Sequence, residues 1–259
     1  MAQLSAPPDH PTGDPILIST KTIPPEDRLI FALDVPTADE ARRLVATLKE
    51  AVRFYKVGLE LFLGAGFALV DWLLEQDKQV FLDLKLYDIP ETVARAVRQI
   101  RTRPITFTTV HYDHRVLEAA CREKGEVGIL AVTVLTSLDQ DGLRDLGIAA
   151  DVHDLVLARA RRALEIGCAG VIASGQESRS LKEGLGEELT IVTPGIRPIE
   201  NRPVESRPAD DQKRVVTVED AIRNGSDYVV IGRPIRDAAD PYEAALHVQG
   251  TLQGMFLSG

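Results

Sequence analysis

The sequence alternates between short apolar runs and longer segments whose apolar residues recur every three or four positions. Eight runs have the length of buried strands, namely 29–35, 54–58, 79–85, 105–111, 127–135, 170–174, 189–195 and 227–232. The segments between them, such as "ADEARRLVATLKEA" (38–51) and "ETVARAVRQIRT" (91–102), have the period of amphipathic helices. An alternation of strands and helices is typical of a parallel sheet.

Eight such units within residues 25–259 favour an α/β fold of the (β/α)8 TIM barrel type in a single domain. A dinucleotide-binding open sheet is disfavoured because no strand leads into a G-x-G-x-x-G turn. Residues 1–24 begin with "MAQLSAPPDHPTGDP", which lacks the basic start and apolar middle of a secretory signal. The proline and polar content of this segment predicts a flexible N-terminal tail before the barrel.

Composition and charge exclude several classes of partner. The formal net charge of −9 argues against non-specific nucleic-acid binding, which depends on positive charge. No apolar run reaches the roughly 18 residues of a membrane-spanning helix, so we expect no membrane partner. The two cysteines, Cys121 and Cys168, form neither a disulfide framework nor a CxxC metal site, which favours the reducing cytoplasm.

The stretch "FLDLKLYDIP" (81–90) places three charges in a segment that otherwise has the pattern of a buried strand. Because strand side chains alternate between faces, Asp83 and Lys85 point one way and the leucines the other. Near the carboxyl end of a barrel strand, the two charges are expected to face the barrel mouth, where barrel active sites form. Asp88 follows in the loop, just before the proline that can open the next helix.

Other strand ends carry matching chemistry. Asp34 ends the first run, Lys56 lies in the second, and Thr136 and Ser137 finish the fifth. Two cations and two or three anions are therefore expected to converge at one mouth. A salt-bridge layer that only closes the barrel is the structural alternative, but such an array more often marks a site with shifted pKa values. His111 is interpreted as a structural residue.

The last two strands carry a second signal. "TPGIRP" (193–198) and "VVIGRPI" (229–235) each place a glycine at a strand end with an arginine close behind. Glycine lets backbone N–H groups approach an anion, and arginine supplies a charged fork. Loops after strands seven and eight commonly bind phosphate in this architecture, which predicts a phosphorylated ligand. The proline-rich, charged segment 198–214 follows the seventh strand and is predicted to be a functional loop.

Several motifs together resemble the orotidine 5′-phosphate decarboxylase family. They occur in the family's order between about residues 29 and 245: "ALDV", "YKVGLELF", "FLDLKLYDIPET", "AVTVLTS", "TPGIRP", "DDQKR" and "VIGRPI". The D-x-K-x-x-D pattern alone is shared with related sugar-phosphate decarboxylases and synthases. Its continuation into I-P, together with P-G-I-R-P, is much more specific.

The resemblance implies a cytoplasmic homodimer that converts orotidine 5′-phosphate to UMP and carbon dioxide in pyrimidine biosynthesis, without metal or organic cofactor. It implies that Lys85 protonates carbon 6 and that Asp83 lies against the substrate carboxylate. Lys56 would contact the sugar while joining the charge array. Asp88 and Thr92 would reach across the dimer interface into the neighbouring site.

The resemblance also implies how the rest of the substrate is held. Asp34 would bind the ribose hydroxyls, and the pair Thr136 and Ser137 would contact the pyrimidine. The phosphate would be held by Arg197, Gln212, Gly232 and Arg233. One departure from the family is "VHYDHRV" (110–116), where Tyr112 and Asp113 replace a small, glycine-bearing stretch.

Two alternative functions remain at this stage. A metal-using sugar-phosphate decarboxylase or aldolase of the same suprafamily would hold a divalent ion near Asp83 and Asp88. A non-catalytic barrel that only binds a phosphorylated ligand is disfavoured by the intact set of Asp83, Lys85 and Asp88.

Overall fold

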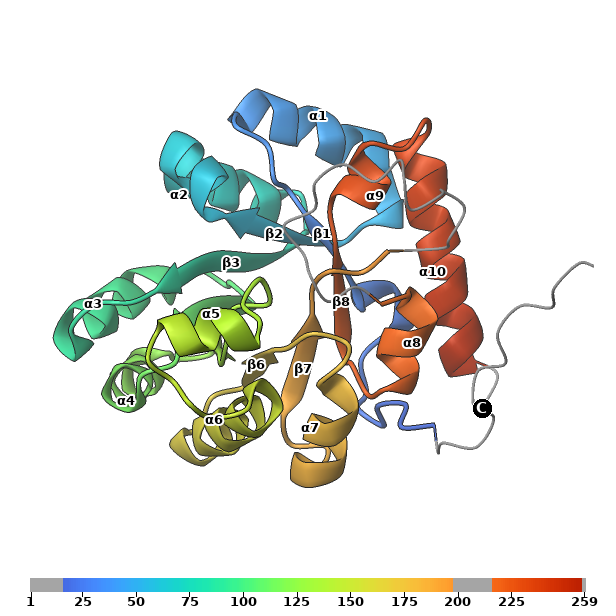
Figure 1. Cartoon of the computed structure of the whole chain (residues 1–259). Helices are drawn as coiled ribbons and strands as arrows, with labels where there is room; N and C mark the ends of the chain where they lie inside the picture. The colour runs from blue at the N-terminus through green and yellow to red at the C-terminus, as the bar shows by residue number, and fades with distance from the viewer. Residues whose placement is uncertain (1–15, 198–215, 258–259) are drawn as a thin grey trace, which may run out of the picture.

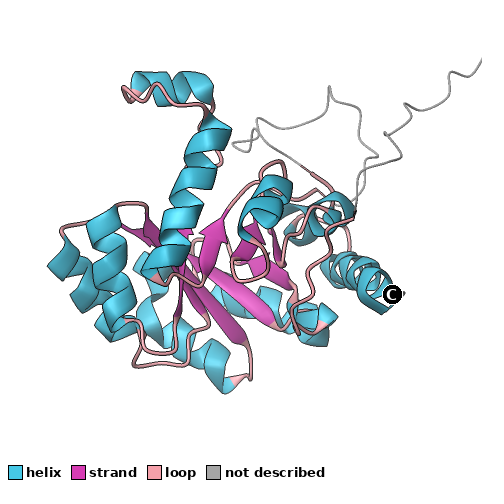
Figure 2. Ribbon diagram, turned by 90° about the horizontal axis from the view of Figure 1, so that it is seen from below, coloured by secondary structure: helices cyan, strands magenta, loops and turns pink. Residues whose placement is uncertain are grey.

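The computed structural model describes residues 16–197 and 216–257. Its eight strands are parallel, pair in chain order and close into a barrel, since the eighth strand pairs with the first. The helices surround the strands, as two perpendicular views show (Figure 1; Figure 2). The predicted (β/α)8 TIM barrel is confirmed.

Each predicted apolar run corresponds to one strand. Most strands are shorter than the run, but the third, Gln79–Leu86, extends one residue beyond the predicted 79–85. The strands are β1 (Leu29–Ala32), β2 (Phe54–Gly58), β3 (Gln79–Leu86), β4 (Phe107–His111), β5 (Gly128–Val132), β6 (Gly170–Ile172), β7 (Thr190–Thr193) and β8 (Tyr228–Ile231). The α-helices are α1 (Ala38–Leu48), α2 (Leu59–Glu75), α3 (Pro90–Ile100), α4 (His114–Glu123), α5 (Gln140–Asp145), α6 (Val152–Ile166), α7 (Ser178–Leu185), α8 (Val218–Arg223), α9 (Arg233–Arg236) and α10 (Pro241–Leu257).

Alternation along the strands divides the apolar residues between two layers. On β1, Ile30 belongs to a cluster inside the barrel to which every strand contributes, whereas Leu29 and Phe31 pack against the surrounding helices. Aromatic rings fill much of the barrel, with Phe54 stacked on Phe107 at a centroid distance of 5.8 Å. The barrel is therefore a packed core, and a ligand can enter only at its ends.

Local signals fix where several helices begin. The Thr37 hydroxyl accepts a hydrogen bond from the Glu40 N–H at the start of α1. The Asp113 carboxylate accepts two backbone N–H groups at the start of α4, and Asp151 does the same for α6. These side chains satisfy N–H groups that have no partner within the helix, so the strand-to-helix connections are defined locally.

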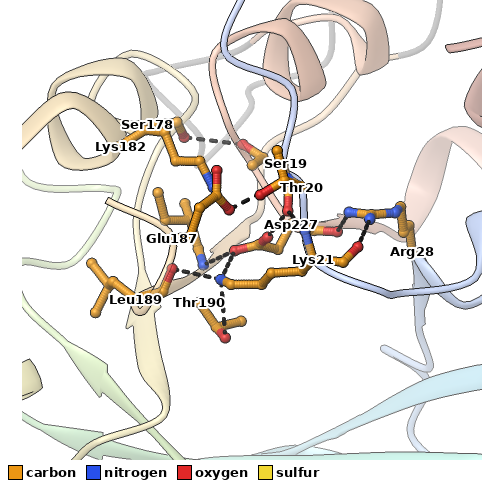
Figure 3. A network of polar contacts seen from close by, with 12 residues as sticks. Ser19, Thr20, Lys21, Arg28, Ser178, Lys182, Glu187, Leu189, Thr190 and Asp227 are labelled. Atoms are coloured by element: carbon orange, nitrogen blue, oxygen red, sulfur yellow. Dashed lines mark hydrogen bonds and ion pairs between the residues drawn. The ribbon is translucent and has the colours of Figure 1, made fainter. Parts of the chain in front are cut away.

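The N-terminal tail was predicted to span residues 1–24, of which residues 1–15 lie outside the described part. The remainder lies against the end of the barrel opposite the mouth (Figure 3). There the Ser19 hydroxyl and the Lys21 ammonium both donate to the buried carboxylate of Asp227, which directly precedes β8. The Lys21–Asp227 distance is 2.7 Å, so this part of the segment is held by a buried ion pair.

No helix within residues 16–197 and 216–257 is long and apolar enough to cross a membrane. Cys121 and Cys168 are both free, and the fold brings their sulfur atoms to 3.6 Å from each other. The sequence did not predict this contact, because the two cysteines are 47 positions apart in the chain.

Candidate functional site

Four charged side chains meet at the barrel mouth, three of them on β2 and β3 and one on the loop that follows β1. The Lys85 ammonium lies 2.8 Å from each oxygen of the Asp83 carboxylate. The Lys56 ammonium lies 2.9 Å from Asp34 Oδ1 and 3.6 Å from Asp83 Oδ2. The array therefore alternates in sign in the order Asp34, Lys56, Asp83, Lys85, and the predicted convergence of these charges is confirmed.

Burial differs sharply along this array. The side chains of Lys56 and Asp83 are only 11% and 10% exposed, whereas those of Lys85 and Asp34 are 38% and 55% exposed. The central pair is therefore shielded from water, and the two outer groups can be reached by a ligand. Two reachable groups of opposite charge on a buried support suit a site that binds a polar molecule.

The pKa values of Lys56 and Asp83 show that the central pair of the array is charged. Burial alone would raise the pKa of Asp83, but the ammonium groups of Lys56 and Lys85 outweigh it and hold that pKa below its usual value. Burial would likewise lower the pKa of Lys56, but Asp83 and Asp34 outweigh it and raise that pKa. Both central groups are therefore ionised at neutral pH, and each stabilises the other.

The backbone of β3 departs from a regular strand at Lys85. Leu82 pairs with Thr108 and Leu86 pairs with Val110. Between these two pairs, β3 therefore contains two more residues than β4. Lys85 has a φ of +46°, a conformation that residues with a side chain seldom adopt. The alternation of side chains predicted that Lys85 lies beside Asp83. In the structure the two side chains do meet, but a bulge changes the direction of the Lys85 side chain.

A glycine makes room for the outer pair of the array. Gly58 ends β2, and a Cβ atom there would lie 3.3 Å from both Asp34 Oδ1 and the Lys56 ammonium nitrogen. Any larger residue would push into the ion pair. An open cavity of about 450 Å³ borders Asp34 on the side of α1 and Arg236.

Asp88 and Thr92 are not brought to this array within the single chain. Asp88 is exposed, and its carboxylate accepts a hydrogen bond from the Ile89 N–H. Thr92 lies in the first turn of α3. Two large apolar side chains flank Asp88, and Tyr87 and Ile89 are each 66% exposed. The loop from β3 to α3 thus presents a carboxylate and apolar surface outward.

The predicted phosphate residues lie on the loops after β7 and β8. Arg197 follows β7, and its N–H donates to the carbonyl oxygen of Val216. Gly232 and Arg233 follow β8, which pairs with β1, and a Cβ on Gly232 would lie 3.6 Å from Asp34 Oδ2. These two residues therefore lie on the Asp34 side of the mouth. Gln212 and the predicted functional loop 198–214 lie outside the described residues.

The remaining predicted contacts lie on the loops after β4 and β5. Because β5 ends at Val132, Thr136 and Ser137 lie in a turn beyond the strand rather than at its end, a correction to the predicted run 127–135.

Asp113 caps α4, and the ring of Tyr112 lies 5.0 Å from the Arg159 guanidinium. The unusual loop at 110–116 is thus a regular helix start with one cation–π contact.

His111 ends β4 beside the array. Burial, followed by the nearby charge of Lys85, lowers the pKa of its imidazole. The ring packs against Tyr87 at a centroid distance of 5.9 Å. A neutral, half-buried histidine in an aromatic contact fits the structural role predicted for it.

Sequence reasoning missed Thr109, which lies on β4 directly beside the array. Its buried hydroxyl donates to Asp83 Oδ1 at 2.8 Å and accepts from the Lys85 N–H at 2.9 Å. The only signal was two threonines in the middle of the apolar run 105–111, and threonine is common in strands.

The arrangement of donor groups shows where a metal ion could be ligated in the described part of the chain. In the described part of the chain, one group of three donor residues lies close enough to share an ion: Asp151, His153 and Asp154 at the exposed start of α6. Asp83 instead has both oxygens occupied by the ammonium group of Lys85. The charge array is therefore built around cations that the protein itself supplies.

Comparisons with known proteins agree on one family. Residues 27–248 match the model of the family described as Orotidine 5′-phosphate decarboxylase / HUMPS family. The chain is 58% identical over 246 residues to orotidine 5′-phosphate decarboxylase of Methylococcus capsulatus, covering 95% of this chain and 100% of that protein. It is 47% identical to the protein of the same name from Rhodopseudomonas palustris, covering 85% and 92% of the two chains.

Solved structures give the same result. The crystal structure of orotidine 5′-phosphate decarboxylase from Lactobacillus acidophilus matches with a TM-score of 0.77 at 33% identity, covering 87% of this chain and 99% of that one. The enzyme of the same name from Pyrococcus horikoshii matches with a TM-score of 0.69 at 25% identity, covering 87% and 99% of the two chains.

Proposed function

This chain belongs to the orotidine 5′-phosphate decarboxylase / HUMPS family, and on that premise we propose how its barrel mouth converts orotidine 5′-phosphate to UMP and carbon dioxide. The activity is that of a carboxy-lyase of pyrimidine biosynthesis, as the family match and the names of the relatives indicate. The assignment of individual residues is our proposal. The single observation that carries it is the charged, partly accessible Lys85–Asp83 pair.

Lys85 is the acid. When the bond between carbon 6 and the carboxylate breaks, carbon dioxide leaves and an electron pair remains on carbon 6 in the plane of the ring, where ring resonance cannot delocalise it. A fixed ammonium group beside this carbon stabilises the developing charge and then donates its proton, which completes UMP. The exposure of Lys85 at the mouth and its contact with Asp83 support this role.

Asp83 and Lys56 prepare the site for this step. Asp83 holds the Lys85 ammonium in one position before the substrate arrives, so little reorganisation is needed during the reaction. Its negative charge also lies where the substrate carboxylate must bind, which disfavours the bound ground state relative to the neutral product carbon dioxide. Lys56 keeps Asp83 ionised and, with Asp34, holds the ribose.

Phosphate binding takes place away from the reacting carbon. Arg197 and Arg233, which follow β7 and β8, supply the charge, and the backbone N–H of Gly232 is proposed to donate to the phosphate beside them. Gln212 and the segment 198–214 complete this part of the site, and Thr136 and Ser137 contact the pyrimidine. Binding energy from the phosphate then helps hold the carboxylate against Asp83.

The enzyme is a homodimer in which Asp88 and Thr92 serve the neighbouring site. Exposed apolar residues support this proposal, because Leu59 and Leu63 on α2 are 55% and 78% exposed and Tyr87 and Ile89 flank Asp88. Exposed apolar side chains on two elements that follow neighbouring strands are typical of an interface. Burying these side chains would carry Asp88 toward the partner. Two free thiols fit a reducing compartment, and we place the dimer in the cytoplasm.

The decisive experiment follows the loss of pyrimidine ultraviolet absorbance when the folded protein is mixed with orotidine 5′-phosphate. We expect stoichiometric UMP, and its absence would refute the proposed reaction. A metal-dependent sugar-phosphate enzyme is the competing candidate from the same family. Full decarboxylase activity after exhaustive chelation excludes it, whereas activity that returns only with a divalent ion supports it. A non-catalytic binding barrel would bind UMP yet release no carbon dioxide.

A further inference from the structure

Thr109 touches both members of the Lys85–Asp83 pair from the adjacent strand. Its hydroxyl donates to Asp83 Oδ1 at 2.8 Å and accepts from the backbone N–H of Lys85 at 2.9 Å. The residue is fully buried on β4. One hydroxyl group therefore fixes a carboxylate oxygen of the array and the main chain of its lysine at the same time.

The bond to the main chain matters because β3 is irregular at this point. Between the pairs Leu82–Thr108 and Leu86–Val110 the ladder is interrupted, and Lys85 has a φ of +46°. A backbone N–H that leaves the ladder needs another acceptor, because a buried unpaired donor is costly. The Thr109 hydroxyl is that acceptor, so it supports the strained conformation that aims Lys85 at Asp83.

We propose that Thr109 is a positioning residue for decarboxylation, which holds the Lys85 backbone and the Asp83 carboxylate in their reactive arrangement. This inference rests on the proposed role of Lys85 as the acid. Thr109 does not touch the substrate in this scheme. It acts by keeping the proton donor in one place, and a small misplacement of a reacting group can cost a large factor in rate.

The neighbouring Thr108 is a matched control. It is also fully buried on β4, and its hydroxyl donates to the carbonyl oxygen of Leu82 at 2.9 Å, away from the array. Replacing either threonine by valine removes one buried hydroxyl and one or two hydrogen bonds on the same strand. The two variants therefore separate positioning of Lys85 from general loss of stability.

The experiment measures kcat, KM and the pH profile for Thr109→Val, Thr109→Ser and Thr108→Val. We expect Thr109→Val to lower kcat by about tenfold to a hundredfold, the value of one or two hydrogen bonds, with KM changed much less. Thr109→Ser should recover most of the rate because it keeps the hydroxyl. Thr108→Val should keep kcat within about twofold. Loss of a donor to Asp83 should move the acidic limb of the profile to higher pH.

Equal kcat values for Thr109→Val and Thr108→Val would overturn the inference, as would a Thr109→Ser variant no faster than the valine variant. If Thr109→Val does not fold, Thr109→Ala replaces it with the same criterion. Lys85→Ala is measured in parallel. If it keeps its turnover, the proposed acid is wrong, whereas an inactive Lys85→Ala beside a fully active Thr109→Val refutes only the role of Thr109.

A second inference comes from the contact between Cys121 and Cys168 at the other end of the barrel. Their sulfur atoms lie 3.6 Å apart, with Cys168 buried just before β6 and Cys121 partly accessible on α4. The Lys124 ammonium bonds to the carbonyl oxygen of Gly167 beside them. The hydrogen bond from Cys168 and the charge of Lys124 lower the pKa of Cys121, which favours a reactive thiolate.

We infer that this dithiol is oxidised to an intrachain disulfide by small-molecule disulfides such as oxidised glutathione. The Cys121 thiolate attacks the small disulfide and releases one glutathione thiolate. The Cys168 thiol, after losing its proton, attacks the Cys121 sulfur and releases the second glutathione. Two protein hydrogens are lost in all, and the new bond joins α4 to the start of β6, opposite the catalytic mouth.

The experiment incubates the whole protein with oxidised glutathione and measures intact mass and free thiols after unfolding. We expect the loss of two hydrogens, no free thiol, full reversal by a dithiol reductant and kcat within about twofold of the reduced enzyme, because the mouth is remote. Cys168→Ser should stop at one glutathione adduct on Cys121, and Cys121→Ser should stay unmodified because Cys168 is buried. A lasting adduct or two free thiols in the unchanged protein would refute the disulfide.

Discussion

The Lys85 ammonium bridges both oxygens of the Asp83 carboxylate at 2.8 Å, although the two residues are only two positions apart on β3. Side chains two apart on a regular strand stand side by side on one face. Here the bulge and the positive φ of Lys85 turn the ammonium onto the carboxylate itself. The ion pair of Lys85 and Asp83 is thus made within one strand, and Lys56 and Thr109 contact it from the strands on either side.

Removing the Lys85 ammonium should abolish turnover while leaving the nucleotide site in place. We expect Lys85→Ala to lose at least about a thousandfold in kcat, since both charge stabilisation and proton donation disappear. Binding of UMP, measured by calorimetry, should persist. Lys78→Ala is the control, because Lys78 lies at the other end of the barrel on the carbonyl groups of Lys49 and Val52. Near-normal turnover by Lys85→Ala would disprove the assignment.

Arg233 should contribute more to the binding of a nucleotide, through its phosphate, than to the binding of the nucleoside alone. We expect Arg233→Ala to weaken UMP binding by about tenfold to a hundredfold, the value of a charge-assisted hydrogen bond. Uridine serves as the internal control, and its affinity should stay within about twofold because it lacks the phosphate. Titration calorimetry with both ligands measures the ratio. An equal loss for UMP and uridine would show that Arg233 acts on the sugar or the fold instead.

The charge array predicts how stability depends on pH. Burial opposes the charge of Asp83, but Lys56 and Lys85 outweigh it and hold its pKa below the usual 3.8. A lowered carboxylate pKa contributes stability that is complete above the unfolded value and is lost as pH falls through the folded value. The difference in unfolding free energy between the unchanged protein and Asp83→Asn should therefore be constant from about pH 5 to pH 8 and shrink below about pH 4. Urea denaturation at several pH values measures this difference in unfolding free energy. A difference that grows as the pH falls would contradict the lowered pKa of Asp83.

Subunit mixing tests the role of Asp88. If Asp88 serves the neighbouring site, a heterodimer of Lys85→Ala and Asp88→Ala contains one site with both residues intact. Random re-association of an equimolar mixture makes about half of the dimers heterodimers, so mixing two nearly inactive variants should restore about a quarter of the activity of the unchanged protein. Mixing Lys85→Ala with Asp83→Asn is the control, because those residues belong to one array and no complete site can form. Failure of the first mixture to exceed the second would assign Asp88 to its own subunit.

The exposed apolar residues test the interface itself. We expect Ile89→Asp to shift the protein toward monomers and to lower specific activity at low protein concentration, since a charge is costly in an apolar interface. Leu146→Asp is the control, because Leu146 follows α5 and is similarly exposed, at 63%. Sedimentation velocity measures the distribution. An unchanged distribution for Ile89→Asp would place the interface elsewhere.

The buried ion pair at the closed end should affect stability only. Lys21→Ala leaves the fully buried Asp227 without its cation, which should cost about 3–5 kcal/mol of unfolding free energy. The pKa of Lys21 is lowered by burial before Asp227 offsets part of that effect, which shows how far the ammonium is withdrawn from water. Turnover at saturating substrate should stay unchanged, because this end lies opposite the mouth. Thermal unfolding together with kcat checks both expectations.

The sequence by itself determined the barrel and most of its mouth. Apolar periodicity marked all eight strands, because burial on one or both faces leaves its period in the chain. The spacing of Asp83 and Lys85 placed their charges on one face, and the chain contained Asp34 at the end of the first run and Lys56 within the second. Each of these predictions depended on residues close together in the chain, or on the rule that parallel strands end at one edge.

Only the tertiary structure decided what depends on contacts between distant segments. At the bulge, the backbone N–H of Lys85 donates to the Thr109 hydroxyl, 24 residues away in the chain. Lys21 is buried because Asp227, 206 residues away, lies beneath β8, and the thiols of Cys121 and Cys168 meet across 47 residues. Such contacts produce no repeating pattern in the sequence, because a single hydrogen bond or ion pair involves only two residues that are far apart in the chain. The packing of the closed barrel brings the two residues of each contact together.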